Sequence, residues 1–138
     1  MIDSSTEFGA RVLRRLAEEE VIWLVTVGKS GTPHPNPVWF LWDGSELLVY
    51  SQPNKTKLRD IERNGRVALH FNTAPDGDDV VVIAGDARID PSAPPADRVE
   101  AYLEKYRAGI GRIGMTPESF AASYSVAIRI TPTKVRGF

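Results

Sequence analysis

Positive charge gathers where a short helix is predicted to begin. Lys55, Lys57 and Arg59 fall in its first turns, with hydroxyl donors available from Ser51 and Thr56. The partial positive charge of a helix N-terminus disfavours each nearby cation by roughly 0.3–1 kcal/mol. A bound anion resolves this conflict, because the free N–H groups of the first turn and the lysine ammonium groups together form a phosphate site. The pattern therefore predicts an anion site, and a solvated basic helix face is the alternative.

A proline-rich strand upstream is the second candidate for ligand binding. It is expected over residues 34–42, and the prolines near its start remove backbone donors, so it cannot be paired on both sides throughout. The Asn36 side chain and the backbone of Val38 and Trp39 then remain available to a flat polar ligand. Trp39 and Phe40 point to opposite faces, so one aromatic ring lines a pocket while the other packs inward. An ordinary edge strand, protected by proline against aggregation, is the alternative.

The elements that must position these residues predict a mainly β protein of one domain over residues 1–138. Strands are expected over residues 21–27, 34–42, 46–51, 67–72 and 79–89 and from about residue 124 onward. Helices are expected over residues 5–19, 54–63 and 95–107 and from residue 116. The first three strands follow one another without an intervening helix, which favours a closed or nearly closed antiparallel barrel over a doubly wound parallel sheet.

Local signals place several ends and irregularities of these elements. Ser4 and Glu7 have capping-box spacing at the start of the first helix. Asn64 and Gly65 are typical of a helix C-cap, and they follow the helix that carries the lysines. Gly85 indicates a bulge in the long fifth strand.

Composition limits the classes of function. The net charge is −1 with a pI near 6.1, and there is no cysteine. These values argue against a nucleic-acid partner, a disulfide scaffold and a thiolate site. Neither a secretory signal nor an apolar run of the roughly 20 residues that a membrane helix needs is visible. We therefore expect a cytoplasmic protein that uses no membrane.

Two glycine motifs resemble nucleotide sites without their context. Gly28-Lys29-Ser30 matches the end of a P-loop, but Trp23 occupies the position of the earlier glycine. Gly109 to Gly114 spells G-x-G-x-x-G, but it follows a predicted helix instead of opening one after a strand. We interpret the first as a hairpin turn and the second as a mobile loop near a pocket.

The two histidines, His34 and His70, do not form a convincing catalytic or metal site. A metal would lack a clear third ligand, and no nucleophile-elbow motif accompanies them. We expect no metal, and a structural role for His70.

The order of these motifs resembles the pyridoxamine-phosphate-oxidase-like split-barrel superfamily. The resemblance is carried by Pro35-Asn36-Pro37-Val38-Trp39-Phe40, by Ser51-Gln52-Pro53-Asn54-Lys55-Thr56-Lys57 and by the ending Tyr124–Phe138. The ending is similar to an actinobacterial branch of reductases that depend on a deazaflavin, coenzyme F420. The resemblance implies a six-stranded antiparallel split β-barrel of Greek-key type with short peripheral helices, and a homodimer with two cofactors at its interface.

The resemblance also implies roles for particular residues. Lys55 and Lys57 would hold the cofactor phosphate, with Ser51, Gln52 and Thr56 beside it. The segment Asn36, Pro37, Val38 and Trp39 would lie along the cofactor ring. The sequence has Lys55-Thr56-Lys57 where authentic pyridoxamine-phosphate oxidases have an arginine-lysine pair, and its C-terminus is shorter. Oxidation of pyridoxamine phosphate itself is therefore not expected.

The expected activity is hydride transfer between F420 and a small conjugated or carbonyl substrate. The cofactor carries such chemistry, so the lack of obvious catalytic side chains is no obstacle. FMN is the alternative cofactor, and Arg59, Arg63 and Arg66 could meet the polyglutamate tail of F420. A non-catalytic deazaflavin carrier and a haem-binding protein with His34 or His70 as axial ligand are the other readings.

Overall fold

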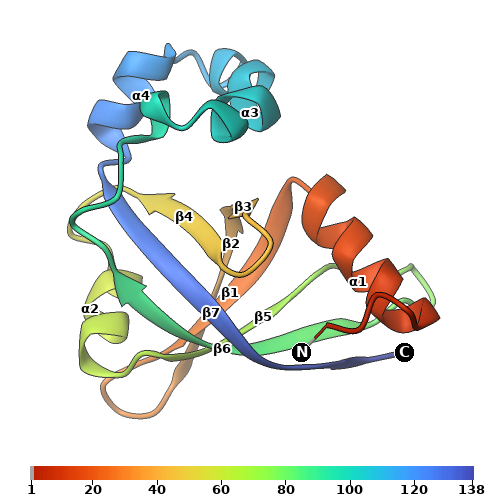
Figure 1. The fold of residues 1–138 in the computed structure, drawn as a ribbon. Helices are drawn as coiled ribbons and strands as arrows, with labels where there is room; N and C mark the ends of the chain where they lie inside the picture. The colour runs from red at the N-terminus through yellow and green to blue at the C-terminus, as the bar shows by residue number, and fades with distance from the viewer. Residues whose placement is uncertain (1) are drawn as a thin grey trace.

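The computed structural model describes residues 2–138 and shows one curled antiparallel sheet with helices around it (Figure 1). Its strand order is β2-β1-β5-β6-β7-β4-β3. The strands are β1 (Val21–Val27), β2 (Pro33–Trp39), β3 (Leu41–Trp42), β4 (Leu47–Ser51), β5 (Arg66–His70), β6 (Val81–Ile89) and β7 (Val126–Gly137). The helices are α1 (Glu7–Glu18), α2 (Thr56–Arg63), the 3-10 turn η1 (Ala96–Arg98), α3 (Glu100–Arg112) and α4 (Pro117–Ser123). The split-barrel prediction is confirmed, with seven strands instead of six.

The seventh strand arises because the expected strand 34–42 breaks at Phe40. The hydroxyl of Tyr106 on α3 accepts a hydrogen bond from the Phe40 N–H at 2.8 Å and lies 2.6 Å from the Glu20 carbonyl oxygen. Lys105 donates to the Phe40 carbonyl at 2.8 Å. These contacts satisfy the backbone of Phe40 outside the sheet, so β2 ends at Trp39 and β3 turns to pair with β4.

Two apolar cores share strand β4. Leu47 and Val49 point into the barrel interior, whereas Leu48 and Tyr50 pack under α3 and α4. Both faces of β4 are therefore covered, and all five of its residues are buried. Figure 1 shows α3 and α4 together above the barrel, with α1 apart from them.

One predicted cap is wrong, whereas the C-cap at Asn64 and the bulge are confirmed. The first helix begins at Glu7, so Thr6 and not Ser4 is its N-cap, and the Thr6 hydroxyl accepts the Gly9 N–H at 2.9 Å. Asn64 is the C-cap of α2, in an extended and not a left-handed conformation, and its N–H donates to the Asp60 carbonyl at 2.7 Å. Gly65 is instead required for packing, because a Cβ there would lie 2.7 Å from the Ala87 carbonyl oxygen. The ladder between β6 and β7 changes register at Gly85.

The segment Gly109 to Gly114 is mostly helical, so its interpretation as a mobile loop is wrong. The helix α3 continues to Arg112, because Tyr102, Tyr106 and Ile110 bury one face at helical spacing. Gly109 lets the Trp39 ring approach, since a Cβ there would lie 3.1 Å from it. Ile113 and Gly114, the latter with φ +78°, form a turn beyond the helix.

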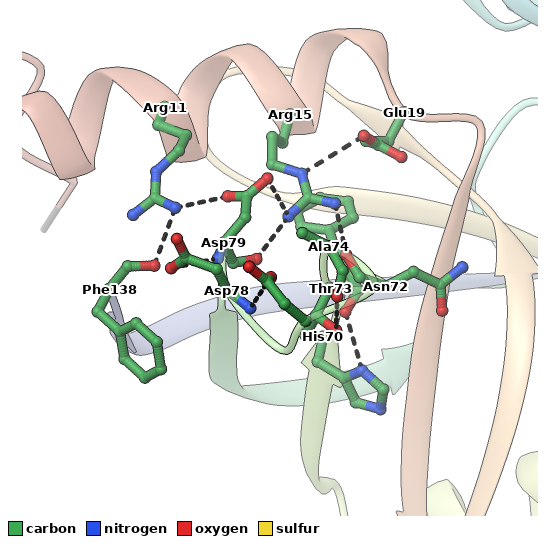
Figure 2. A network of polar contacts seen from close by, with 12 residues as sticks. Arg11, Arg15, Glu19, His70, Asn72, Thr73, Ala74, Asp78, Asp79 and Phe138 are labelled. Atoms are coloured by element: carbon green, nitrogen blue, oxygen red, sulfur yellow. Dashed lines mark hydrogen bonds and ion pairs between the residues drawn. The ribbon is translucent and has the colours of Figure 1, made fainter.

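Two arginines of α1 fasten the loop between β5 and β6 and the end of β7 (Figure 2). Arg11 pairs with Asp79 and donates to the Phe138 carbonyl at 2.9 Å. Arg15 donates to the carbonyls of Asn72 at 2.8 Å and Asp79 at 3.1 Å. The contacts hold α1 across the edge of the barrel. No helix among residues 2–138 is both long and apolar enough to cross a membrane.

Candidate functional site

A pocket of about 380 Å³ lies where β2 and β4 end, α2 begins, and α3 and α4 cover the barrel. It brings together most of the residues predicted from sequence to bind a cofactor. Those in its lining are Pro37, Val38, Trp39, Ser51, Gln52, Lys55 and Lys57. The predicted phosphate and ring segments, which are separate in the sequence, thus meet around one cavity.

Two predicted residues do not line this pocket. The Asn36 amide lies 3.5 Å from the His34 carbonyl oxygen on the same strand. The Thr56 hydroxyl accepts from the Arg59 guanidinium at 3.3 Å, and this arginine also donates to the Asn54 carbonyl. Arg59 therefore holds the turn that leads into α2.

One end of the pocket carries uncompensated positive charge. Lys57 is half-buried, and its burial, together with the nearby Lys55 ammonium, lowers the pKa of Lys57. Among residues 2–138 no carboxylate forms an ion pair with either lysine. The first turn of α2 has no acidic residue, and no side chain caps its N-terminus. This arrangement suits a bound anion.

The other end of the pocket is a wall of stacked aromatic rings. The Trp39 ring stacks on Tyr106 at 4.6 Å and on Phe120 at 5.7 Å, and Phe120 stacks on Tyr124 at 4.4 Å. Gln52 donates to the Ser123 hydroxyl at 3.1 Å and so ties α4 to the barrel. A flat ring can lie against such a surface.

Of the side of the pocket formed by α3 and α4, the sequence predicted only that the Gly109–Gly114 segment lies near a pocket, and Ile113 of this segment is in the lining. The additional lining residues are Tyr50, Tyr102, Ile113, Phe120 and Tyr124. In the sequence, the helical spacing of Tyr102, Leu103 and Tyr106 indicates a helix with one packed face and no more than that. The proximity of α3 to the end of β4 depends on tertiary packing, which a one-dimensional pattern does not contain.

The helix α2 is fixed to the barrel through a buried carboxylate. Asp60 accepts hydrogen bonds from Thr26 at 2.8 Å and Arg63 at 3.0 Å, and lies 2.8 Å from His34 Nδ1. Burial alone would raise the pKa of Asp60, but the hydrogen bonds from His34, Thr26 and Arg63 outweigh it and lower the pKa. The network sets where α2, and with it Lys57, lies.

The histidines lie outside the pocket lining. The Asp60 carboxylate contacts both the Thr26 hydroxyl and the His34 imidazole. In a nucleophilic triad the imidazole, and not the carboxylate, contacts the hydroxyl, so Thr26, Asp60 and His34 do not form one. His70 stacks on Trp23 with ring centroids 6.0 Å apart.

The fold and site define a class of protein: an antiparallel split barrel whose pocket is lined by both lysines and aromatic rings. Residues 8–138 match the family model described as pyridoxamine 5'-phosphate oxidase. The chain belongs to this family, whose relatives include oxidoreductases.

The names of individual relatives point to different ligands. The pyridoxine/pyridoxamine 5'-phosphate oxidase of Edwardsiella ictaluri is 34% identical over 58 residues, which are 41% of this chain and only 27% of that enzyme. A solved F420 reductase is 27% identical, with a TM-score of 0.65 over 89% of this chain and 94% of that one. The haem storage protein of Vibrio cholerae is 13% identical, with a TM-score of 0.66 over 96% of this chain and 95% of that one, a likeness of fold alone.

Proposed function

We propose that this protein binds coenzyme F420 and is an oxidoreductase that transfers a hydride between it and a small conjugated or carbonyl substrate. Lys55 and Lys57 would hold the cofactor phosphate, with Ser51 and Gln52 beside it. The ring system would lie towards Trp39. FMN is the alternative cofactor, since both cofactors join a flat tricyclic ring to a phosphate.

The observation that carries the proposal is the position of Lys57 in the pocket lining. Lys57 is half-buried at a helix N-terminus next to Lys55, without a carboxylate partner among residues 2–138. Keeping a cation there lowers stability, and an anionic phosphate bound beside it would reverse the sign of that contribution. An exposed lysine on an ordinary basic face would not be buried in this way.

The choice of F420 over FMN is supported by one observation. The F420 reductase resembles this chain over nearly the full length of both, whereas the match to the pyridoxamine-phosphate oxidase spans 58 residues. The Lys55-Thr56-Lys57 segment departs from the arginine-lysine pair of pyridoxamine-phosphate oxidases, which argues against pyridoxamine phosphate as substrate and does not distinguish the two cofactors. Haem is less well supported, because neither imidazole lines the pocket.

The protein's own contribution to the reaction is binding and orientation. The cofactor, when bound, supplies the hydride chemistry. The lysines would fix one end of it, and the wall formed by Trp39, Phe120 and Tyr124 would fix the plane of the ring and exclude water from its covered face. No step in this scheme requires a nucleophilic side chain.

The test is a parallel titration of the protein with F420 and FMN, followed by fluorescence. We expect F420 to bind and Lys57→Glu to abolish binding while the protein stays folded. Lys29→Glu is the matched control, because Lys29 is exposed in the β1–β2 turn and makes the same charge change away from the pocket. Equal affinity in Lys57→Glu and wild type would contradict the proposed site.

We also propose that the protein is a homodimer. Val21 and Trp23 of β1 pair with Trp39 and Pro37 of β2, so an exposed apolar sheet face continues directly into the pocket lining. Val21 is 37% exposed although it is a large apolar residue. Light scattering should give a dimer for wild type and for a control with Ala10→Glu, at an exposed position of α1 away from this face, and a monomer for Val21→Glu. A monomeric wild type would refute the dimer.

A further inference from the structure

Tyr102 is the most deeply buried polar side chain that faces the pocket. It lies on α3, is 1% exposed and lines the cavity. Its ring packs edge-on against Tyr50 at 5.0 Å and lies 4.8 Å from Tyr106. These contacts fix the ring, so its hydroxyl has a defined position.

The hydroxyl of Tyr102 has no hydrogen-bond partner within residues 2–138, in contrast to its two neighbours. The Tyr50 hydroxyl donates to the Pro94 carbonyl at 2.6 Å, and the Tyr106 hydroxyl bonds to the backbone of Phe40. Within residues 2–138, every side-chain oxygen or nitrogen that is fully shielded from solvent has a hydrogen-bond partner. The Tyr102 hydroxyl must therefore reach open space, and the space that it lines is the pocket.

Two other polar side chains of the pocket lining already have hydrogen-bond partners within the protein. Ser51 donates to the Gln52 carbonyl at 2.8 Å, and the Gln52 amide donates to Ser123. Burial and the neighbouring tyrosines raise the pKa of Tyr102, so its hydroxyl keeps its proton and can donate. The Tyr124 hydroxyl also lines the pocket without a partner among residues 2–138, but its residue is only half-buried, whereas Tyr102 is 1% exposed, so Tyr102 is the deeply buried donor there that lacks an acceptor.

We infer that the Tyr102 hydroxyl donates a hydrogen bond to a carbonyl oxygen of the ring-shaped ligand at the aromatic end of the pocket. The inference rests on the proposed function and deepens it. The carbonyl could belong to the cofactor ring or to a conjugated substrate held against it. In either case Tyr102 is a positioning residue that selects ligands with an acceptor at that place.

The test compares Tyr102→Phe with wild type, using lumichrome, a flavin ring with carbonyl groups and no phosphate. We expect the denaturation midpoint without ligand to stay unchanged or rise, because no protein hydrogen bond is lost. The affinity for lumichrome, measured by fluorescence anisotropy, should fall by roughly 3- to 10-fold, as for loss of one hydrogen bond. Tyr106→Phe is the matched control, and it should lower the midpoint because its hydroxyl is bonded inside the protein.

The source of the carbonyl follows from measurements with F420 and with 2-cyclohexenone as substrate. A weaker F420 affinity in Tyr102→Phe assigns the carbonyl to the cofactor. An unchanged F420 affinity with a raised KM for cyclohexenone assigns it to the substrate. Unchanged affinity for lumichrome, or no lumichrome binding by wild type, overturns the inference. If neither F420 nor FMN binds, the proposed function fails while the lumichrome comparison still decides the role of Tyr102.

Discussion

Replacing Lys57 by methionine should stabilise the ligand-free protein while removing its affinity for a cofactor phosphate. Methionine keeps an unbranched apolar stem of similar length, so packing against the pocket wall is retained. The change removes a half-buried ammonium that has no carboxylate partner within residues 2–138 and lies beside Lys55. Stability and binding should therefore move in opposite directions, as expected for a residue kept for function.

The size of the gain follows from the position of Lys57 in the second residue of α2. A cation at a helix N-terminus costs about 0.3–1 kcal/mol, so Lys57→Met should raise the free energy of unfolding by about that amount at pH 7. The folded-state pKa of Lys57 lies below its unfolded value of 10.5, so the ammonium opposes folding at neutral pH. The gain should shrink as the pH rises towards 10.5.

Urea denaturation without ligand measures this difference, with Lys29→Met as the exposed control, for which no gain is expected. The affinity for FMN or F420 should fall by about 10- to 100-fold, the usual effect of losing a charged hydrogen bond. A loss of stability of about 1 kcal/mol or more in ligand-free Lys57→Met would refute the reasoning, because it would mean that the lysine supports the fold.

Two further substitutions test the frame around the site. Asp60→Asn should lower the free energy of unfolding at pH 7 by roughly 2 kcal/mol, because charged hydrogen bonds to a buried carboxylate are lost. Since the folded pKa of Asp60 lies below its unfolded value of 3.8, the wild-type advantage should be full above about pH 5 and disappear as the pH falls below 3.8, which denaturation at pH 6 and pH 3 would show. An advantage independent of pH would contradict this role. Gly65→Ala should lower stability by about 1–3 kcal/mol, since its Cβ would meet the Ala87 carbonyl at 2.7 Å; an unchanged melting temperature would show that the backbone yields.

Elements with strong local patterns were predictable from the sequence. The strand Val21–Val27 agrees residue for residue with the prediction, and the opposite orientations of Trp39 and Phe40 follow from strand geometry. The bulge at Gly85 could be predicted because a glycine inside a strand often marks a bulge. These features depend on neighbours in sequence, and local rules describe them well.

Features that depend on distant contacts were not predictable. The break at Phe40 requires the Tyr106 hydroxyl, which lies 66 residues away. The same helix brings Tyr102 to the pocket, and its glycines remain helical because tertiary packing outweighs their low helix propensity. Of the candidate site, the sequence therefore predicted the barrel side and, apart from placing Gly109–Gly114 near a pocket, missed the side formed by α3 and α4.

The central claim is that the positive end of the pocket recognises a cofactor phosphate. The most direct measurement compares the affinity for FMN with that for riboflavin, which differs from FMN only in lacking the phosphate; F420 and its deazaflavin ring without phosphate and tail are the second pair. In wild type the phosphorylated compound should bind at least tenfold more tightly, and in Lys57→Met this preference should largely disappear. Equal affinities for both compounds in wild type, or a preference that Lys57→Met leaves intact, would contradict the account.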